Sequence, residues 1–366
     1  MKGRVFILTP DSPERAGGVE HFVREMIKGL ERRGYEVGVF HRGNSEPKWL
    51  STRTGRIGKK LTGTLNGFWI GRNAQKHLTD NVIMVISNSD VGYYRLRSKT
   101  AVKLVHFYHG TYRAQSEAIR TFISRTGYLY LKWWNSMVLE RLSGRSKLVL
   151  ANSEQVRDEV KQFFGQEATT VWLPIDTERF KPADLSASRR ALNLPTDRPV
   201  GLFVGSAHPM KGLSIVRLLM DRLPEVHWVL ALRGDLPENK VARRDVTMFQ
   251  NVSPKQISLF YNAADFSVCP SLYEPFGYVV AESLACGTPV IASPGGASRL
   301  FLRERPLDRL FISDPNAVNG FLGAAREVLR DSSFYRRAVI ERVRPKLEEL
   351  MAHENWWRRF FEVAGL

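Results

Sequence analysis

The segment PSLYEPFGYVVAESLACGTPVIASPGGAS, residues 270–298, decides the fold that we expect for this 366-residue chain. An apolar run at 266–269 leads into the segment and a second, at 289–292, lies inside it. We therefore expect two strands joined by a helix that begins near Gly277. Glycine at a helix start lets a ligand approach the backbone closely, and the N–H groups of the first turn attract an anion. The segment thus predicts an anion site at a strand–helix junction.

Two carboxylates eight residues apart flank this helix start. Glu274 precedes the expected helix and Glu282 lies more than one turn inside it. A carboxylate accepts hydrogen bonds from sugar hydroxyls, so each Glu can hold one set of hydroxyls while the first turn holds a phosphate. A phosphate between two sets of hydroxyls describes a sugar nucleotide. The backbone expected to hold the phosphate belongs to Phe276, Gly277, Tyr278 and Val279.

The same stretch resembles the E-x7-E signature of the retaining glycosyltransferases of family four, the glycosyl transferases group 1, which have the GT-B fold. The similarity extends through ACGTPV to the glycine pair Gly295-Gly296. It implies that Glu274 binds the donor sugar and that Glu282 binds the ribose. It also implies an α/β architecture of two facing Rossmann-like domains, with a C-terminal helix that crosses back to the first domain. In such enzymes the leaving phosphate oxygen takes the acceptor's proton, and no protein nucleophile is required.

A loop after an expected strand of the second domain, VGSAHPMKG, extends the resemblance. The family pattern implies that Lys211 points at the donor diphosphate, where an ammonium group neutralises charge on the leaving group. Gly205 and Ser206 belong to the same donor-binding loop. The family usually has Arg where this chain has Ser206, so one phosphate-binding cation is missing, which puts donor affinity in doubt. Arg233 and His208 are the candidates to replace it.

The N-terminal part opens as a βαβ unit, with strands expected at 4–9 and 35–40 around a helix at 19–33. Gly17 and Gly18 precede that helix, in a pattern that resembles the start of the family. The glycine pair would let the backbone approach the donor phosphates or the acceptor.

His109 directly follows an expected strand at 102–108. In open α/β sheets ligands bind at the carboxyl ends of the strands. The strand-His-Gly order resembles the family's, which implies that His109 contacts the donor sugar or its reacting centre. We therefore predict His109, Lys211 and Glu274 as the catalytic residues. We expect His106, on the strand itself, to be structural.

The chain is long for one core, so we expect two domains. Residues 171–182 resemble the interdomain linker of the family. We predict an acceptor-side domain at 1–175, a nucleotide-sugar domain at 176–351, and a tail at 352–366 that crosses back to the first domain. We expect the aromatic residues of the tail to face the core.

The charge is uneven along the chain. Lys and Arg outnumber Asp and Glu by 54 to 37, and residues 37–150 hold 19 basic against 5 acidic residues. Such a field favours an anionic partner: a membrane surface, a phosphorylated or lipid-linked acceptor, or nucleic acid. The segment 43–71 predicts a basic loop with at most a short helix. A helix expected at 121–142 carries Trp133 and Trp134 among basic residues, which suits either a bilayer interface or the domain core.

Other sites are not indicated. No apolar run reaches the length of a spanning helix, and Cys269 and Cys286 form no disulfide framework. We therefore expect the protein to be cytoplasmic, either free or attached peripherally to the inner face of the membrane. The chain has no D-x-D and no cluster of residues with metal-ligand spacing, so we predict no metal. We expect no cofactor beyond the nucleotide-sugar co-substrate, with UDP or GDP as the carrier.

The predicted function is retaining transfer of a hexosyl unit from a nucleotide sugar to a lipid-linked or anionic glycan, in cell-envelope, polysaccharide or glycolipid synthesis. Alternatives are transfer to a soluble small molecule and a nucleotide-sugar 2-epimerase of related fold, which would act without an acceptor. A basic nucleic-acid-binding protein is supported only by the pI near 10.0, and no such motif is visible, so we expect no nucleic-acid partner. Ser206 also motivates a catalytically inactive sugar-nucleotide binder.

Overall fold

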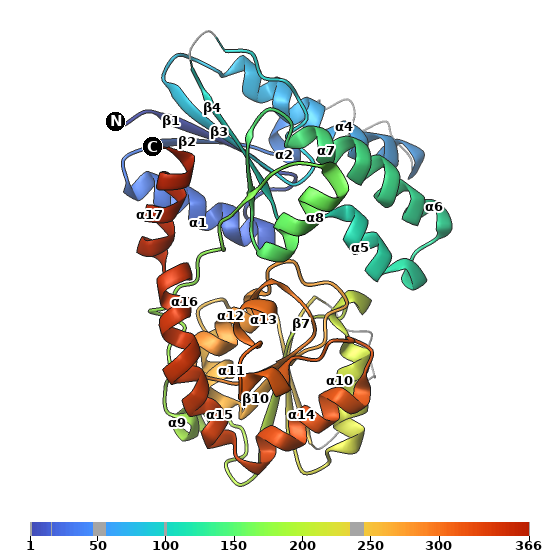
Figure 1. Cartoon of the computed structure of the whole chain (residues 1–366), viewed down its shortest axis with the longest axis vertical. Helices are drawn as coiled ribbons and strands as arrows, with labels where there is room; N and C mark the ends of the chain where they lie inside the picture. The colour runs from blue at the N-terminus through green and yellow to red at the C-terminus, as the bar shows by residue number, and fades with distance from the viewer. Residues whose placement is uncertain (1, 16, 47–55, 99–100, 235–244, 366) are drawn as a thin grey trace. The chain divides into compact units, whose positions relative to one another are not determined.

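A computed structural model describes residues 2–15, 17–46, 56–98, 101–234 and 245–365. The chain forms two compact units, Met1–Pro174 with Trp357–Leu366, and Ile175–Trp356. The boundaries expected from the sequence were residues 175 and 352. Each unit is an α/β layer structure built on one parallel sheet (Figure 1).

The first unit holds a six-stranded sheet in the order β2-β1-β3-β4-β5-β6, with every pair of neighbours parallel. The chain passes from β1 outward to β2 and then returns to the other side of β1 as β3. The direction of winding therefore reverses between β1 and β3, the place where open α/β sheets bind ligands. The strands are β1 (Arg4–Leu8), β2 (Glu36–Phe40), β3 (Val82–Asn88), β4 (Lys103–Tyr108), β5 (Leu148–Ala151) and β6 (Thr169–Thr170).

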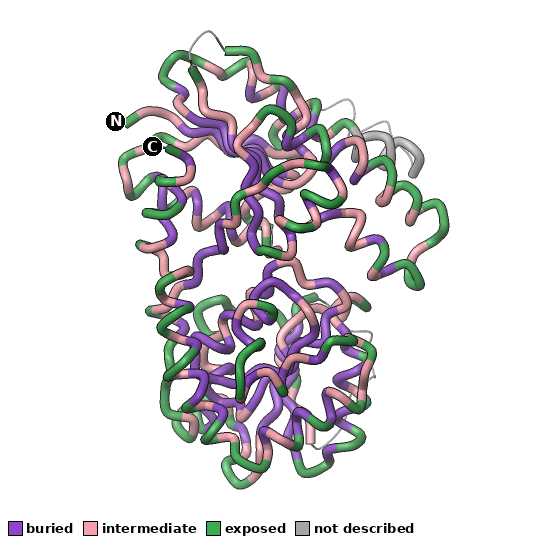
Figure 2. The backbone as a smooth tube through the Cα atoms, in the orientation of Figure 1, coloured by how far each residue is buried: buried purple, intermediate pink, exposed green. Residues whose placement is uncertain are grey.

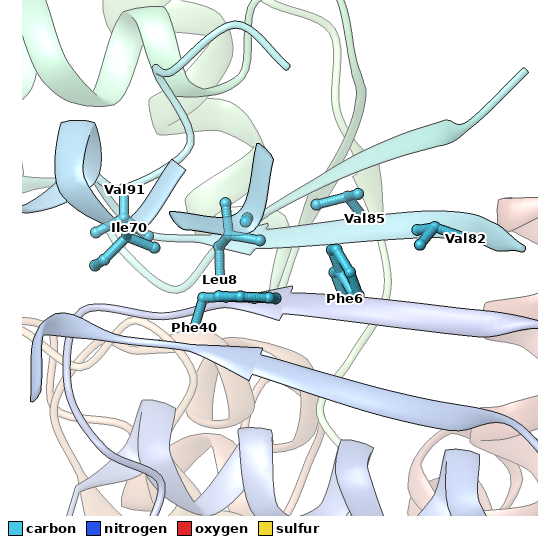
Figure 3. Close-up of a cluster of buried hydrophobic side chains, with 8 residues drawn as sticks. Phe6, Leu8, Phe40, Ile70, Val82, Val85 and Val91 are labelled. Carbon is cyan, nitrogen blue, oxygen red and sulfur yellow. The ribbon is translucent and has the colours of Figure 1, made fainter. Parts of the chain in front are cut away.

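Apolar strands covered on both faces make the core of this unit. A parallel sheet is buried on both faces, which explains near-continuous apolar runs such as RVFIL in β1. Phe6 and Leu8 on β1 pack with Phe40 on β2 and with Ile70 of helix α4 (Arg56–Lys76) (Figure 3). Buried and exposed residues alternate on the covering helices, as amphipathic helices require (Figure 2).

The remaining helices of the first unit surround this sheet. They are α1 (Gly18–Arg32), α2 (Arg42–Ser45), α5 (Tyr112–Ala118), the 3-10 turn η1 (Arg120–Phe122), α6 (Arg125–Leu129), the π-helix η2 (Tyr130–Glu140), α7 (Arg141–Ser143), α8 (Glu154–Phe164) and the C-terminal α17 (His353–Ala364). One expectation was wrong. The basic loop predicted at 43–71 is helical from Arg56 onward, although 47–55 lie outside the described residues. The helix predicted at 121–142 is confirmed from Arg125 onward, where α6, η2 and α7 follow one another without a break, and the short 3-10 turn η1 precedes it.

The end of the chain packs on the first unit. The indole of Trp357 lies over Gly29 of α1, Phe361 contacts Tyr35 at 5.9 Å between ring centroids, and the Nζ of Lys103 donates to the carbonyl of Gly365 at 2.6 Å. Trp357 and Phe360 are buried, which confirms that the aromatic tail faces the core.

The second unit holds a five-stranded sheet in the order β11-β10-β7-β8-β9, again parallel. Its winding reverses between β7 and β10. The strands are β7 (Val200–Ser206), β8 (His227–Arg233), β9 (Val246–Gln250), β10 (Phe266–Cys269) and β11 (Val290–Ala292). The helices are α9 (Leu185–Ala191), η3 (Pro209–Lys211), α10 (Leu213–Arg222), α11 (Ile257–Ala263), α12 (Tyr278–Ala285), α13 (Gly296–Phe301), η4 (Leu307–Leu310), α14 (Val318–Arg330), α15 (Ser332–Ala338), η5 (Val339–Val343) and α16 (Arg344–Met351).

Candidate active site

The second unit brings two of the predicted site residues into direct contact where its winding reverses. Lys211 ends the short turn η3 after β7, and Glu274 follows β10. The Nζ of Lys211 donates to Oε2 of Glu274 at 2.8 Å. The hydroxyl of Ser271 donates to the same oxygen at 3.1 Å. The carboxylate is therefore held in one position by two donors from two different loops.

Gly212 allows this contact. Its φ of +70° is in the left-handed region that favours glycine, and a Cβ there would lie 2.0 Å from the carbonyl oxygen of Pro270. The backbone also joins the two loops, because Leu272 N donates to the carbonyl of Met210 at 2.8 Å. The Lys211 loop thus packs directly on the end of β10, which explains the glycine that follows the lysine in the sequence.

The ion pair keeps the lysine charged in a largely enclosed place. The Glu274 carboxylate raises the pKa of Lys211 above its usual value, against the opposing effect of desolvation. Lys211 is therefore an ammonium group throughout the neutral range, and it is available to an incoming anion.

A helix N-terminus lies next to this pair in the sequence. Gly277, with φ +94°, is the N-cap of α12 and offers no side-chain cap to the first turn. The first N–H groups of a helix have no acceptor within it, and they carry the positive end of its dipole. The side chain of Phe276 is buried. The helix that the sequence predicted at this glycine is confirmed.

The glycine loop at 295–296 clamps the same segment. Gly296 N donates to the carbonyl of Glu274 at 3.1 Å, and a Cβ at Gly295 would lie 2.7 Å from that oxygen. These contacts fix the backbone on which the Glu274 carboxylate stands.

Glu282 lies in the second turn of α12, and its surroundings differ from those of Glu274. The hydroxyl of Tyr261 donates to its Oε2 at 2.9 Å. Burial raises the pKa of Glu282 to about 7, although the Tyr261 hydrogen bond and the charge of Arg179 both oppose the rise. Glu282 is thus a carboxyl group that exchanges its proton near neutral pH.

His109 directly follows β4 in the first unit, and its hydrogen bond to Asn88 determines which ring nitrogen carries the hydrogen. Asn88 donates through Nδ2 to the carbonyl of Leu8 at 3.0 Å, so its Oδ1 is the atom that meets His109 Nε2 at 2.9 Å. Nε2 must then carry the hydrogen, and Nδ1 is a hydrogen-bond acceptor. Burial lowers the pKa of His109 to about 3. The ring is neutral at physiological pH and cannot act as a proton donor through Nδ1.

Gly17 and Gly18 lie at the start of α1. Gly17 is its N-cap in an extended conformation with φ −178°, which any residue adopts. A Cβ at Gly17 would collide with the carboxylate of Glu20. Glycine is therefore needed at position 17 to leave space for the Glu20 side chain, and its backbone angle is one that any residue adopts.

Two family models match this chain. The model for glycosyl transferases group 1 matches residues 185–344, and the model for glycosyltransferase family 4 matches residues 16–179. A probable transglycosylase from Burkholderia thailandensis is 31% identical over 294 residues, which cover 75% of this chain and 73% of that protein. The chain belongs to glycosyltransferase family 4.

Other relatives agree with this family. D-inositol 3-phosphate glycosyltransferase 2 of Catenulispora acidiphila is 27% identical over 333 residues, covering 77% of this chain and 75% of that protein. Sucrose-phosphate synthase from Thermosynechococcus elongatus superposes with a TM-score of 0.79 at 20% identity, over 99% and 98% of the two chains. Anabaena HepE, solved with UDP and glucose, superposes with a TM-score of 0.71 at 18% identity, over 99% of both chains. The fold is GT-B, and the protein is a glycosyltransferase of the group 1 type.

For this family 4 glycosyltransferase, the sequence did not indicate several polar residues of the site. Ser271 and Tyr261 were missed because a single Ser or Tyr carries no signal without its partner. In the first unit, the sequence did not indicate Asp90, which follows β3 at the point where that sheet reverses. Burial raises the pKa of Asp90 to about 6. Nearby on η2, Glu140 accepts from Tyr112 N at 2.9 Å, and burial holds its pKa well above the usual value.

Within the described residues, no group of three or more His, Cys, Asp and Glu side chains is placed to hold a metal ion. In the same part of the chain, no helix is long and apolar enough to cross a membrane. Cys269 and Cys286 are buried and unpaired.

Proposed function

We propose that this glycosyltransferase moves a hexosyl unit from a nucleotide sugar to an acceptor, with retention at the anomeric carbon. The observation that carries the proposal is the Lys211–Glu274 contact at the carboxyl ends of β7 and β10, beside the N-terminus of α12. A cation and helix N–H groups suit the diphosphate, and a fixed carboxylate suits the sugar hydroxyls. The Lys211 ammonium group, the N-terminus of α12 and the Glu274 carboxylate thus offer partners for both the phosphates and the sugar of one ligand.

The residues divide the work of transfer. Lys211 neutralises the diphosphate as the leaving group gains charge. Ser271 and Lys211 both engage Oε2 of Glu274, so we assign the other carboxylate oxygen to a hydroxyl of the donor sugar. Glu282 holds the ribose. The leaving phosphate oxygen takes the acceptor's proton, so positioning and charge stabilisation supply the catalysis and no protein nucleophile is used.

His109 serves as an acceptor in this scheme. Its neutral ring, with the hydrogen on Nε2, offers Nδ1 to a hydroxyl of the donor sugar. The backbone at Gly17 and Gly18 faces the donor phosphates or the acceptor. No cofactor is assigned beyond the nucleotide-sugar co-substrate. UDP is favoured as the carrier because HepE was solved with it, and GDP is the alternative.

The acceptor that we propose is anionic. Residues 37–150 carry 19 basic against 5 acidic residues, and a related protein is named for inositol 3-phosphate. A lipid-linked or phosphorylated glycan of the cell envelope meets this requirement. A small phosphorylated metabolite meets it as well, and the membrane experiment at the end of the Discussion separates the two.

An outward-facing apolar surface favours the lipid-linked acceptor. The surface, which we call the aromatic face, comprises Phe122, Leu129, Tyr130, Trp133, Trp134 and Leu142. Trp133 is 58% exposed and Trp134 is 46% exposed. The buried positions of the same stretch are mostly polar: Asn135, Ser136, Leu139, Glu140 and Ser143. A helix in water normally buries its apolar side, so this inversion calls for a further apolar environment.

The charge around the aromatic face selects its occupant. Arg120 and Arg125 are exposed beside it, and the carboxylate of Glu117 is paired with Lys132 at 2.6 Å. Aromatic rings among basic side chains are typical of a surface that lies on an anionic bilayer. We therefore propose peripheral attachment of the first unit to an anionic membrane.

A transfer assay tests the proposed reaction. A thermal-shift panel of UDP-, GDP-, ADP- and dTDP-sugars first identifies the donor, since a ligand that binds only the folded state raises the melting temperature. Glu274→Ala and Lys211→Ala should each lower turnover by about 10- to 150-fold, the effect of losing a charge-assisted hydrogen bond. Lys255→Ala, in the exposed turn before α11, is the control and should leave turnover unchanged.

Two results would contradict the proposal. Near wild-type turnover in a folded Glu274→Ala protein would remove Glu274 from the donor site. Conversion of the sugar nucleotide in the absence of any acceptor would indicate an epimerase instead.

A further inference from the structure

The position of Ser206 leaves the proposed diphosphate site with one cation fewer than the family pattern provides. Ser206 is the last residue of β7, and its hydroxyl cannot neutralise phosphate charge. Lys211 is the cation already described, and part of its charge is balanced by Glu274. A diphosphate carries more negative charge than this partly balanced lysine offsets. The N-terminus of α12 adds only a partial positive charge, so a second cation at the same sheet edge would complete the site.

The strand register identifies that cation. In the parallel pair β7·β8, Ser206 is the direct partner of Arg233, the last residue of β8. Neighbouring strands lie about 4.8 Å apart, and residues in register on parallel strands project from the same face of the sheet. The backbone of Arg233 therefore lies one strand away from that of Ser206, and both side chains leave the same face of the sheet. The Arg233 side chain is long enough to span the distance between the strands.

We propose that Arg233 supplies from β8 the diphosphate-binding cation that position 206 lacks, so that Lys211 and Arg233 together hold the donor phosphates. This inference rests on the proposed function. The side chain is exposed at the carboxyl edge of the sheet, where a ligand can reach it. A guanidinium group binds two phosphate oxygens at once, which a lysine does not.

The charges of the two residues already act on each other. Arg233 is among the groups that lower the pKa of Lys211, although the Glu274 carboxylate has the larger and opposite effect. Two cations at one edge repel until an anion lies between them. A bound diphosphate relieves that repulsion. When no diphosphate is bound, the Glu274 carboxylate balances the charge of Lys211.

His208, the other candidate from the sequence, has a different role. Its Nδ1 accepts a hydrogen bond from Met210 N at 3.2 Å and caps the turn η3. The cap directs the ring toward the backbone of its own loop. His208 shapes the loop that presents Lys211, and the missing charge comes from Arg233.

The test compares nucleoside diphosphates with their nucleosides. Binding of UDP and uridine, and in parallel of GDP and guanosine, is measured by calorimetry for wild type, Arg233→Ala, Ser206→Arg and the double variant. Arg233→Ala should weaken binding of the diphosphate by about 10- to 100-fold and leave the nucleoside unchanged. In the double variant, Ser206→Arg should restore most of the lost affinity. Arg222→Ala, on the surface of α10, is the matched control and should bind as wild type does.

The outcomes separate this inference from the proposed function. Unchanged diphosphate binding in Arg233→Ala, an equal loss for diphosphate and nucleoside, or no recovery in the double variant would each overturn the role of Arg233. If Lys211→Ala loses affinity while Arg233→Ala does not, only this inference fails. If wild type binds no nucleoside diphosphate at all, the proposed function fails with it.

Discussion

At the level of single residues, the environment of Glu282 couples the donor site to pH. Burial raises its pKa to about 7 in the folded chain, whereas an unfolded Glu titrates near 4.3. Between these values the folded state holds a proton that the unfolded state has lost. The stability contributed by Glu282 is therefore present below about pH 4 and is lost as the pH rises through about 7.

The isosteric variant Glu282→Gln tests this directly. Glutamine cannot ionise, yet its oxygen can still accept from the Tyr261 hydroxyl. We expect the variant to unfold at a higher temperature than wild type at pH 8 and to differ little at pH 4, where both states of the wild-type Glu282 are protonated. One pKa unit corresponds to about 1.4 kcal/mol, so we expect a gain on the order of 2 kcal/mol after allowing for partial exposure. Glu349→Gln, exposed on α16, is the control, and equal pH profiles for both variants would refute the shift.

At the level of elements, the contact between α17 and α1 depends on one missing side chain. A Cβ at Gly29 would lie 2.0 Å from the indole of Trp357. The guanidinium of Arg33, one turn later, stacks on the same ring at 4.7 Å. The absence of a side chain at Gly29 therefore lets the indole of Trp357 pack directly on the backbone of α1.

Two Gly→Ala substitutions separate this contact from helix propensity. Alanine stabilises a helix interior by about 0.5–1 kcal/mol relative to glycine. Gly323→Ala, on α14 with no atom within 4 Å of the new Cβ, should show that gain. Gly29→Ala should instead destabilise the fold by about 1–3 kcal/mol, because Trp357 must move. Denaturant unfolding measures both, and a Gly29→Ala protein as stable as Gly323→Ala would show that α17 is not seated there.

Most strands could be predicted because a parallel strand that is buried on both faces appears in the sequence as a continuous run of apolar residues. β9, with the sequence VTMFQ, was missed because it lies at the sheet edge and mixes polar with apolar residues. α4 was taken for a loop because its glycines and threonines weaken the helical signal, which its packing through Ile70 overrides.

The candidate site was predictable only in part. The motif located Glu274, Glu282 and Lys211, since each lies at a fixed distance from a glycine or a strand. Their contacts could not be read from it: the Lys211–Glu274 pair joins residues 63 positions apart. The register of Ser206 with Arg233 is likewise a property of the sheet.

At the level of the whole molecule, charge and apolar exposure coincide within one unit. Residues 37–150 belong to the first unit and hold most of the basic excess of the chain. The aromatic face lies in the same range, on η1, α6, η2 and α7. Each Lys or Arg near an anionic surface contributes about 1 kcal/mol, screened over a Debye length of about 8–10 Å. Several such charges with two inserted rings are enough for reversible attachment.

Sedimentation with liposomes tests this attachment. Wild type should bind vesicles that contain phosphatidylglycerol, remain in the supernatant with neutral vesicles, and be released by high salt. Trp133→Ser combined with Trp134→Ser should lose most of the binding, because the rings that enter the headgroup region are gone. Phe334→Ser, on α15 of the second unit, removes a ring that is 43% exposed and should leave binding unchanged. Equal recovery in the supernatant with both vesicle types would discard the membrane proposal and favour a small phosphorylated acceptor. A dimer that the tryptophan variant dissociates, without vesicle binding, would assign the aromatic face to a second copy of the chain.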